Sequence, residues 1–178
     1  TTIQGESLSD YVIFSAYDSA SVVERIISVV IDNDTAELND QRKSIIEMLF
    51  VEGNHICPGC EKSGNCELQA LGYRFGITAP QLEYQFPVRA VDASHPDILI
   101  DHNRCILCTR CVRVCDEVEG AHTWDVTDRG INSRIIVDLN QPWGSSESCT
   151  GCGKCVQVCP TGALFCKGSS VAEMQKRH

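Results

Sequence analysis

The chain has 178 residues, which suits one domain or two small domains and leaves no room for a large catalytic module with its own organic cofactor. Its 24 acidic residues outnumber its 15 basic residues, so the formal net charge is -9, and no run of lysine and arginine stands out. Nucleic acid and anionic membrane surfaces are therefore poor candidate partners. No apolar run approaches the roughly 20 residues that a membrane helix needs. We expect docking to a defined protein partner.

Twelve cysteines could indicate a disulfide framework, but their spacing favours metal ligation. Eleven of them fall into three tight groups with only two to five residues between neighbours, a pattern that suits ligands converging on a point. The first ten residues, TTIQGESLSD, are polar and do not resemble an apolar secretion signal, although a processed signal would leave no trace. We therefore expect a reducing, cytoplasmic location.

The first part of the chain carries no recognisable chemistry. Residues 1–38 contain no cysteine or histidine, and the apolar stretch at 22–30 fits a helix or a strand. A helix is then expected to begin with Asn39 or Asp40 as its N-cap and to stop at Gly53. This helix leads directly into the first cysteine group.

A second short helix is expected at Glu67–Tyr73, and three prolines make residues 78–97 an irregular connector. Beyond it the chain repeats itself, because the cysteine spacing within 98–115 recurs 44 residues later within 148–165. Residues 133–139, SRIIVDL, are expected to form a strand between the two copies.

The predicted fold class is α+β. A helical [4Fe-4S] module with one histidine and three cysteine ligands is followed by a domain like that of two-cluster bacterial ferredoxins. The predicted divisions are an N-terminal segment without metal ligands, the helical module and the ferredoxin-like domain, at residues 1–38, 39–94 and 95–178.

The duplicated motif has the spacing C-x2-C-x2-C-x3-C in both copies. In this ferredoxin pattern three cysteines surround one cubane and the fourth reaches across to the other cluster. Hence one cluster is expected at Cys105, Cys108, Cys111 and Cys159, and the other at Cys149, Cys152, Cys155 and Cys115.

Local sequence differs between the two copies. Gly151 and Gly153 let the backbone approach the ligands closely, and Pro160 follows the second copy. The first copy has Asp116 in place of that proline, so we expect a different last turn there. A pair of four-cysteine zinc ribbons is the alternative, but zinc sites normally pair two C-x2-C units and do not pack four cysteines into eleven residues.

The third cysteine group is one thiolate short of an all-cysteine cubane. A histidine stands just before it, so mixed ligation is the natural completion, by His55, Cys57, Cys60 and Cys66. A neutral imidazole in place of a thiolate makes a cluster less negative and raises its potential. A zinc site, or a histidine that only hydrogen-bonds a cluster sulfur, remains the alternative.

The other notable residues receive ordinary roles. Four histidines are expected to be polar or partly buried side chains, namely His95, His102, His122 and His178. Cys166 is expected to be a small buried residue, and Trp124 and Trp143 to be core or interface anchors. Solvation is favoured over compensation of cluster charge for Arg104, Arg110, Arg113 and Lys154. No catalytic triad, phosphate-binding glycine loop, or nickel or molybdenum site is visible, so no substrate chemistry is expected on this chain alone.

These residues resemble a known family. The segments EGNHICPGCEKSGNCELQ, YQFPVR and SRIIVDLNQPWGSSESCTGCGKCVQVCPTGALF, with the double motif, are similar to the diaphorase gamma subunit of bidirectional, NAD(P)-linked [NiFe] hydrogenases over residues 29–175. That family is itself similar to the N-terminal part of the large iron-sulfur subunit of respiratory NADH:quinone oxidoreductase.

The resemblance implies an enzyme complex with a division of labour. FMN and NAD(P) would lie on a flavin-binding diaphorase subunit, the [NiFe] site on a hydrogenase module reached through its small subunit, and this chain would conduct electrons between them. It also implies the ligand set named above. The family usually carries a plant-type [2Fe-2S] domain whose four cysteines residues 1–28 lack, so that cluster is missing, or the chain is incomplete or divergent there. His55 precedes Cys57 by two residues, as in the hydrogenase relatives, whereas the respiratory relatives have H-x3-C.

Other functions fit parts of the pattern. The respiratory module of an NADH:quinone complex is one, but that subunit continues into a large domain. A freely diffusing polyferredoxin and a zinc-stabilised scaffold are the others, and a brown protein with broad absorption would exclude the scaffold.

Three cubanes predict a defined metal content. Anaerobically purified protein should contain about twelve iron and about twelve acid-labile sulfide, because each ligand group holds four of each. Metal analysis that finds two to three zinc and little iron would refute this prediction.

Overall fold

The computed structural model describes residues 11–16, 25–30 and 32–168. The chain divides into two compact units, Thr1–Arg42 and Lys43–His178. The predicted division at residues 38 and 94 stays a prediction. Among the residues described, no helix is long and apolar enough to cross a bilayer.

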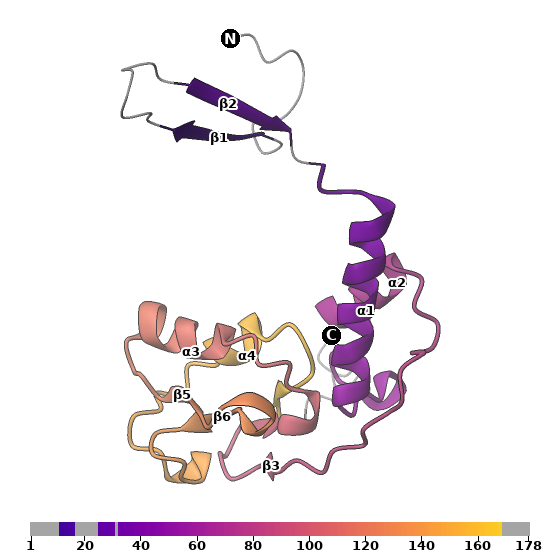
Figure 1. Ribbon diagram of the computed structural model, residues 1–178. Helices are drawn as coiled ribbons and strands as arrows, with labels where there is room; N and C mark the ends of the chain where they lie inside the picture. Colours follow the sequence, from indigo (N-terminus) through magenta and orange to yellow (C-terminus); the bar gives the residue numbers. More distant parts are fainter. Residues whose placement is uncertain (1–10, 17–24, 31, 169–178) are drawn as a thin grey trace, which may run out of the picture. The chain divides into compact units, whose positions relative to one another are not determined.

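The first unit contains an antiparallel hairpin. Its strands are β1 (Tyr11–Ala16) and β2 (Arg25–Val30), with Tyr11 opposite Val30 (Figure 1). The apolar stretch that fitted a helix or a strand is therefore a strand from Arg25 onward, and residues 22–24 lie outside the described part of the chain.

Helix α1 (Ala36–Glu52) begins earlier than predicted. The hydroxyl of Thr35 accepts a hydrogen bond from the backbone N–H of Leu38 at 3.2 Å, so Thr35 supplies the N-terminal cap. The predicted cap at residues 39–40 is wrong because this earlier hydroxyl already satisfies the first turn. The predicted stop at Gly53 is confirmed.

The second unit continues with α2 (Glu67–Arg74), which confirms the second predicted helix. Within the proline-rich connector the regular element is the short strand β3 (Val91–Asp92). Short helical turns punctuate the rest of the unit, at Cys57–Gly59, His102–Arg104, Gly130–Asn132 and Trp143–Ser145.

The remainder repeats the order strand, cysteine motif, helix, strand. The first copy is β4 (Ile98–Asp101), α3 (Arg110–Arg113) and β5 (Trp124–Thr127), and the second is β6 (Arg134–Val137), α4 (Lys154–Val158) and β7 (Leu164–Cys166). The outer strands of the pair meet in an antiparallel sheet of order β3-β4-β7, and the inner strands form the antiparallel pair β5-β6. Helices α3 and α4 lie side by side (Figure 1). The predicted duplication and the predicted strand at 133–139 are confirmed.

The last turn of the first motif differs from that of the second, as expected. Because Asp116 permits helical backbone, α3 continues into a π-helix at Val114–Glu119, which ends at Gly120 with φ 72°. In the second copy α4 ends at Val158, two residues before Pro160.

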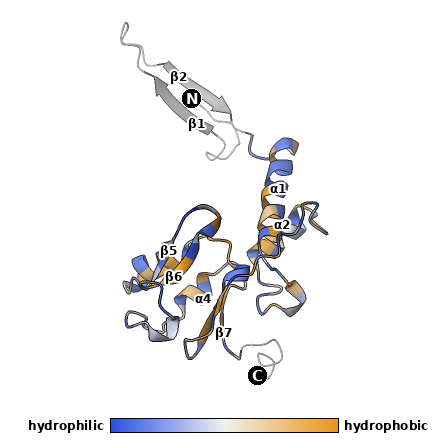
Figure 2. Ribbon diagram, turned by 60° about the horizontal axis from the view of Figure 1, so that its bottom comes forward, coloured by the Kyte–Doolittle hydropathy of each residue, from blue (hydrophilic) through white to orange (hydrophobic). Residues whose placement is uncertain are grey.

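The core of this unit lies between the two copies. Strand residues and tryptophans pack there together with motif cysteines, and strands β6 and β7 are marked as apolar in Figure 2. The buried members are Ile98, Ile100, Cys111, Cys115, Trp124, Ile135, Val137, Trp143, Cys155, Cys159, Ala163 and Leu164. Four of the eight motif thiols are thus part of the apolar core.

Candidate metal centres

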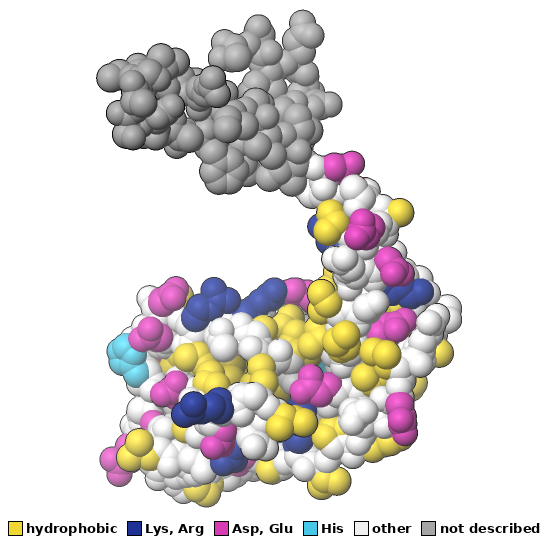
Figure 3. Space-filling view, in the orientation of Figure 1, with side chains coloured by type: hydrophobic (Ala, Val, Ile, Leu, Met, Phe, Trp, Pro, Cys, Tyr) yellow, Lys and Arg dark blue, Asp and Glu magenta, His cyan; other side chains and the backbone are white. Residues whose placement is uncertain are grey.

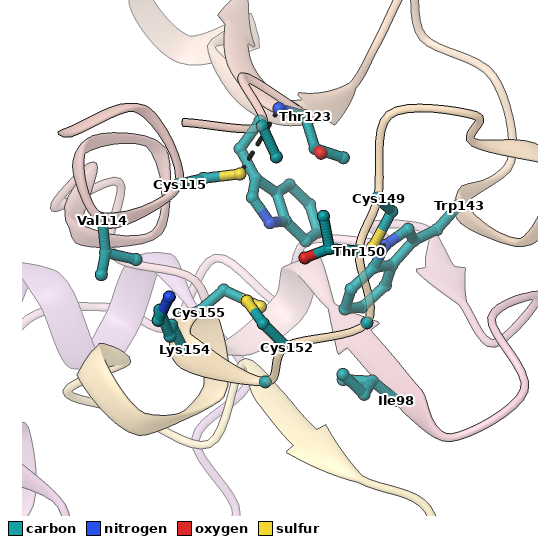
Figure 4. A pocket seen from close by; sticks show the side chains of 14 residues that line it. Ile98, Val114, Cys115, Thr123, Trp143, Cys149, Thr150, Cys152, Lys154 and Cys155 are labelled. Atoms are coloured by element: carbon teal, nitrogen blue, oxygen red, sulfur yellow. Dashed lines mark hydrogen bonds between the residues drawn. The ribbon is translucent and has the colours of Figure 1, made fainter. Parts of the chain in front are cut away.

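Three pockets in the second unit gather the predicted ligands. The pocket called site B is lined by three cysteines of the first motif and the last cysteine of the second, namely Cys105, Cys108, Cys111 and Cys159. The pocket called site C is lined by three cysteines of the second motif and the last cysteine of the first, namely Cys149, Cys152, Cys155 and Cys115 (Figure 4). The cysteines are therefore grouped across the two copies, as the crossed pattern requires.

The pocket called site A is lined by the remaining predicted ligands, His55, Cys57, Cys60 and Cys66. The three pockets hold similar amounts of space free of protein atoms, about 320, 330 and 350 Å³ including their mouths, for sites A, C and B. Figure 3 shows hydrophobic side chains, a class that includes cysteine, gathered in the middle of one face of the second unit, with charged side chains around them. Each site thus offers four donors around a cavity of one size.

The donors surround a volume and not a point. Among the described residues, no three His, Cys, Asp or Glu side chains converge closely enough to hold a single metal ion. A cubane needs less convergence, because its four iron atoms occupy different corners and each takes one thiolate or imidazole from the protein.

The thiols at sites B and C are crowded in a dry environment. The pKa of Cys111 is raised to about 12, chiefly by burial and also by the neighbouring Cys105, Cys159 and Cys108. Burial likewise raises the pKa of Cys155 to about 12. Such thiols give up their protons readily only where metal charge replaces them, because adjacent buried thiolates repel one another.

His55 has the properties of a metal ligand. Its Nε2 is buried and has no hydrogen-bond partner among the described residues. Burial lowers the pKa of its imidazole, against the opposing effect of a hydrogen bond with the backbone of Leu49. Since Nε2 has no partner, that bond is made by Nδ1, which is the usual arrangement of a ligating histidine.

Two glycines make room for site A. A Cβ on Gly53 would lie 2.5 Å from Nε2 of His55, and a Cβ on Gly162 would lie 2.3 Å from Sγ of Cys60. Real side chains do not approach so closely, so both positions require glycine. Gly162 follows the second motif, and the last part of the duplicated unit therefore shapes the site of the first cysteine group.

The loops between the motif cysteines use left-handed backbone in both copies. Leu107 and Thr109 have φ of 55° and 58°, and Gly151 and Gly153, at the same places in the second copy, have φ of 68° and 71°. A Cβ on either glycine would meet no protein atom within 4 Å. Within the protein, glycine is therefore favoured at these positions by the positive φ and not by close packing.

Arg104 connects site A to site B. Its guanidinium donates to Sγ of Cys60 at 3.7 Å and forms ion pairs with Glu61 at 2.8 Å and Asp101 at 3.1 Å. The next residue in the chain is Cys105 of site B. The predicted solvation of Arg104 is wrong, because its side chain is only 18% exposed.

A second connection joins the same two sites through residues next to their cysteines. The backbone N–H of Glu67, next to Cys66, donates to the carbonyl of Pro160, next to Cys159, at 2.9 Å. The carboxylate of Glu67 also accepts two hydrogen bonds from Arg110, the shorter at 2.5 Å. Sites A and B are therefore held together by backbone and side-chain bonds.

The remaining predictions have mixed outcomes. Cys166 is exposed, so its predicted burial is wrong: it is the last residue of β7, where the strand leaves the core. His95 is buried and accepts from the backbone N–H groups of Asp97 and Ile98 at 3.1 and 3.2 Å, which makes it structural. Lys154 pairs with Glu119. His178 lies outside the described residues.

Comparison with known proteins matches two regions of the chain to domains of NADH oxidoreductases. Residues 42–81 match the NADH-ubiquinone oxidoreductase-G iron-sulfur binding region, and residues 95–165 match the ferredoxin-like domain of NADH-quinone oxidoreductase subunit 3. The two matched regions are an iron-sulfur binding region and a ferredoxin-like domain of NADH oxidoreductases, and they contain all twelve predicted ligands.

The chain is also similar to the gamma subunit of the NAD-reducing hydrogenase HoxS of Cupriavidus necator, with 40% identity over 130 residues, 72% of this chain and 55% of that protein. It is 30% identical to NADH-quinone oxidoreductase subunit 3 of Thermus thermophilus over 77% of this chain and 19% of that protein. A chain of an NAD+-reducing [NiFe]-hydrogenase crystallised in the H2-reduced state superposes with a TM-score of 0.74 and 41% identity, over 82% of this chain and 61% of that one. The resemblance to the hydrogenase gamma subunit is confirmed, and the chain spans about half of that subunit's length.

The glycine contacts at site A yield a test with a matched control. Gly162→Ala should displace Cys60 and reduce the iron content by about a third, because the contact blocks one of three four-iron sites. Gly59→Ala, beside the same cysteine, should keep its iron, since a Cβ there meets nothing within 4 Å. Equal iron in the two variants would show that the Gly162 contact does not govern site A.

Proposed function

We propose that this chain is an electron-transfer subunit that holds three [4Fe-4S] clusters, with the ligands His55, Cys57, Cys60 and Cys66 at site A, Cys105, Cys108, Cys111 and Cys159 at site B, and Cys149, Cys152, Cys155 and Cys115 at site C. One observation carries the proposal: twelve donors from three sequence groups are distributed over three pockets, four to each. The unpartnered Nε2 of His55 supports its inclusion.

The protein's contribution is to hold, separate and insulate the sites. A [4Fe-4S] cluster supplies the ability to take up and release one electron. Site A borders site B through Arg104 and through the Glu67–Pro160 hydrogen bond, and site B borders site C through the crossed motifs. The chain thus arranges its sites in the order A, B, C. Hydrogen bonds join sites A and B, and the two cysteine motifs each contribute to both sites B and C.

We also propose that the chain works inside a larger enzyme. Its relatives are named as subunits of an NAD-reducing hydrogenase and of an NADH-quinone oxidoreductase. The higher identity to the first favours electron conduction between a diaphorase subunit that binds FMN and NAD(P) and the small subunit of a [NiFe] hydrogenase. The respiratory module remains the second candidate. A cytoplasmic location stays a prediction.

The crossed ligation can be tested directly. Cys115→Ser should perturb the EPR signal of the cluster bound by the second motif more than that of its own motif, because Cys115 lines site C. Cys166→Ser, outside the three sites, is the matched control and should leave all signals unchanged. A change confined to the cluster at Cys105, Cys108 and Cys111 would establish uncrossed ligation.

The wiring role predicts a selective loss in the assembled complex. Cys111→Ser should retain NAD(P)H oxidation with an artificial acceptor and hydrogen oxidation with an artificial acceptor, since those reactions occur on partner subunits. Hydrogen-dependent NAD(P) reduction should fall at least tenfold, because the conductor is interrupted at site B. Coupled activity equal to that of the Cys166→Ser complex would mean that the chain is a scaffold or a side branch.

A further inference from the structure

Site C contains N–H groups that donate hydrogen bonds to its ligand sulfurs. The indole Nε1 of Trp143 donates to Sγ of Cys149 at 3.2 Å. The backbone N–H of Thr123 donates to Sγ of Cys115 at 3.4 Å, drawn as the dashed line in Figure 4. Two of the four sulfurs of this site therefore have a defined donor.

A second tryptophan lies beside the same site. Trp124 lines the pocket together with Trp143. The rings of Trp124 and Trp143 meet edge to face, with centroids 4.7 Å apart and an interplanar angle of 67°. Each indole thus fixes the orientation of the other.

Trp143 is held in place from its other sides as well. Its side chain is 1% exposed, and its ring centroid lies 4.8 Å from that of His95. Its backbone N–H donates to the carboxylate of Asp92 at 2.7 Å. The direction of the indole N–H is therefore set by contacts within the fold.

Site B has no side-chain N–H donor of this kind among the residues that the structure describes. Its walls are apolar, and they include Ile100, Ile106, Ile135, Ala163 and Leu164. The hydroxyl of Thr161 lies 3.9 Å from Sγ of Cys159, but its hydrogen is used in a 2.8 Å bond to the carbonyl of Arg104. Within residues 32–168, no side-chain N–H group donates to a sulfur of site B.

The charged groups at the rim of site C offset each other. Lys154 lines the pocket and pairs with Glu119, whose carboxylate also accepts from the hydroxyl of Thr150 at 2.8 Å. The pair brings one positive and one negative charge to the same place, so it changes the net charge at site C little.

Donors of this kind favour the reduced state of an iron-sulfur cluster. Reduction adds negative charge to the cluster and its thiolates, and an N–H group aimed at a thiolate stabilises that charge. A site with apolar walls and no side-chain N–H donor compensates less of the added charge. The two sites of the duplicated motif therefore present different environments to the same type of cluster.

We propose that the indole N–H of Trp143 raises the reduction potential of the cluster at site C above that of the cluster at site B, and that Trp124 is a positioning residue that orients this indole. This inference rests on the proposed function, because it requires a [4Fe-4S] cluster at both sites. The cluster with the higher reduction potential holds the electron. An electron shared by the clusters at sites B and C therefore resides at site C.

The test is a redox titration monitored by EPR on anaerobically purified protein that carries Trp143→Phe. Phenylalanine keeps an aromatic ring beside Trp124 and His95 and removes the N–H. The ratio of reduced to oxidised cluster at site C should fall about tenfold at a fixed potential, which corresponds to about 59 mV for one electron. The site C signal is identified as the one altered by Cys115→Ser, and the site B signal should not move.

A matched control separates hydrogen bonding from packing. Ile98 lines site C and is buried but donates nothing to sulfur, so Ile98→Val should leave the potential of site C unchanged. Trp124→Leu removes the edge-to-face contact that orients Trp143 and should lower that potential in the same direction, and it carries the test if the Trp143 variant does not retain iron.

The failures are distinguishable. Wild-type protein without iron would overturn the proposed function. Full iron content with an unchanged site C potential in both tryptophan variants would overturn the role of the indoles alone. An equal fall at sites B and C, or a fall of the same size in Ile98→Val, would also overturn it.

Discussion

Cys115 and Cys159 each end one cysteine motif and line the pocket of the other. Neither copy of the motif can therefore assemble four donors alone, and the two copies must fold against each other. The strands obey the same requirement, because β4 pairs with β7 and β5 pairs with β6, always across the two copies. Four of the cysteines are also core residues, namely Cys111, Cys115, Cys155 and Cys159. Metal binding and burial of the core thus depend on the same side chains, and losing one of these cysteines affects both.

The dependence extends to the first cysteine group. Gly162 leaves space for Cys60, Arg104 donates to the sulfur of Cys60, and Glu67 bonds to Pro160. Each contact joins a residue near a site A donor to a residue near a site B donor. The guanidinium of Arg104 offsets thiolate charge at site A. The backbone carbonyl of Arg104 accepts a hydrogen bond from the hydroxyl of Thr161 beside site B. The region matched to one iron-sulfur family and the domain matched to another are consequently one compact unit.

The sequence predicts what depends on local spacing. The double motif, its duplication, α2, the end of α1 and the strand at 133–139 follow from short-range patterns, and the structure has them. It does not reveal that Arg104 reaches Cys60 or that Trp143 reaches Cys149, because those contacts depend on how distant segments pack. The predicted start of α1 is wrong because Thr35, an equally good N-cap residue, lies earlier in the chain. The predicted burial of Cys166 is wrong because strand β7 extends beyond the core, and the hydrophobicity of the sequence does not show where the core ends.

The left-handed loops have a consequence for the order of events during assembly. At Leu107 and Thr109 a side chain occupies backbone that costs on the order of 1 kcal/mol per residue, whereas Gly151 and Gly153 adopt it without that cost. The left-handed backbone of the second loop is favoured by its glycines, whereas that of the first loop depends on contacts with the surrounding residues. Folding of the second loop is therefore favoured by its own sequence, whereas the first loop reaches its final shape only once the surrounding unit has packed.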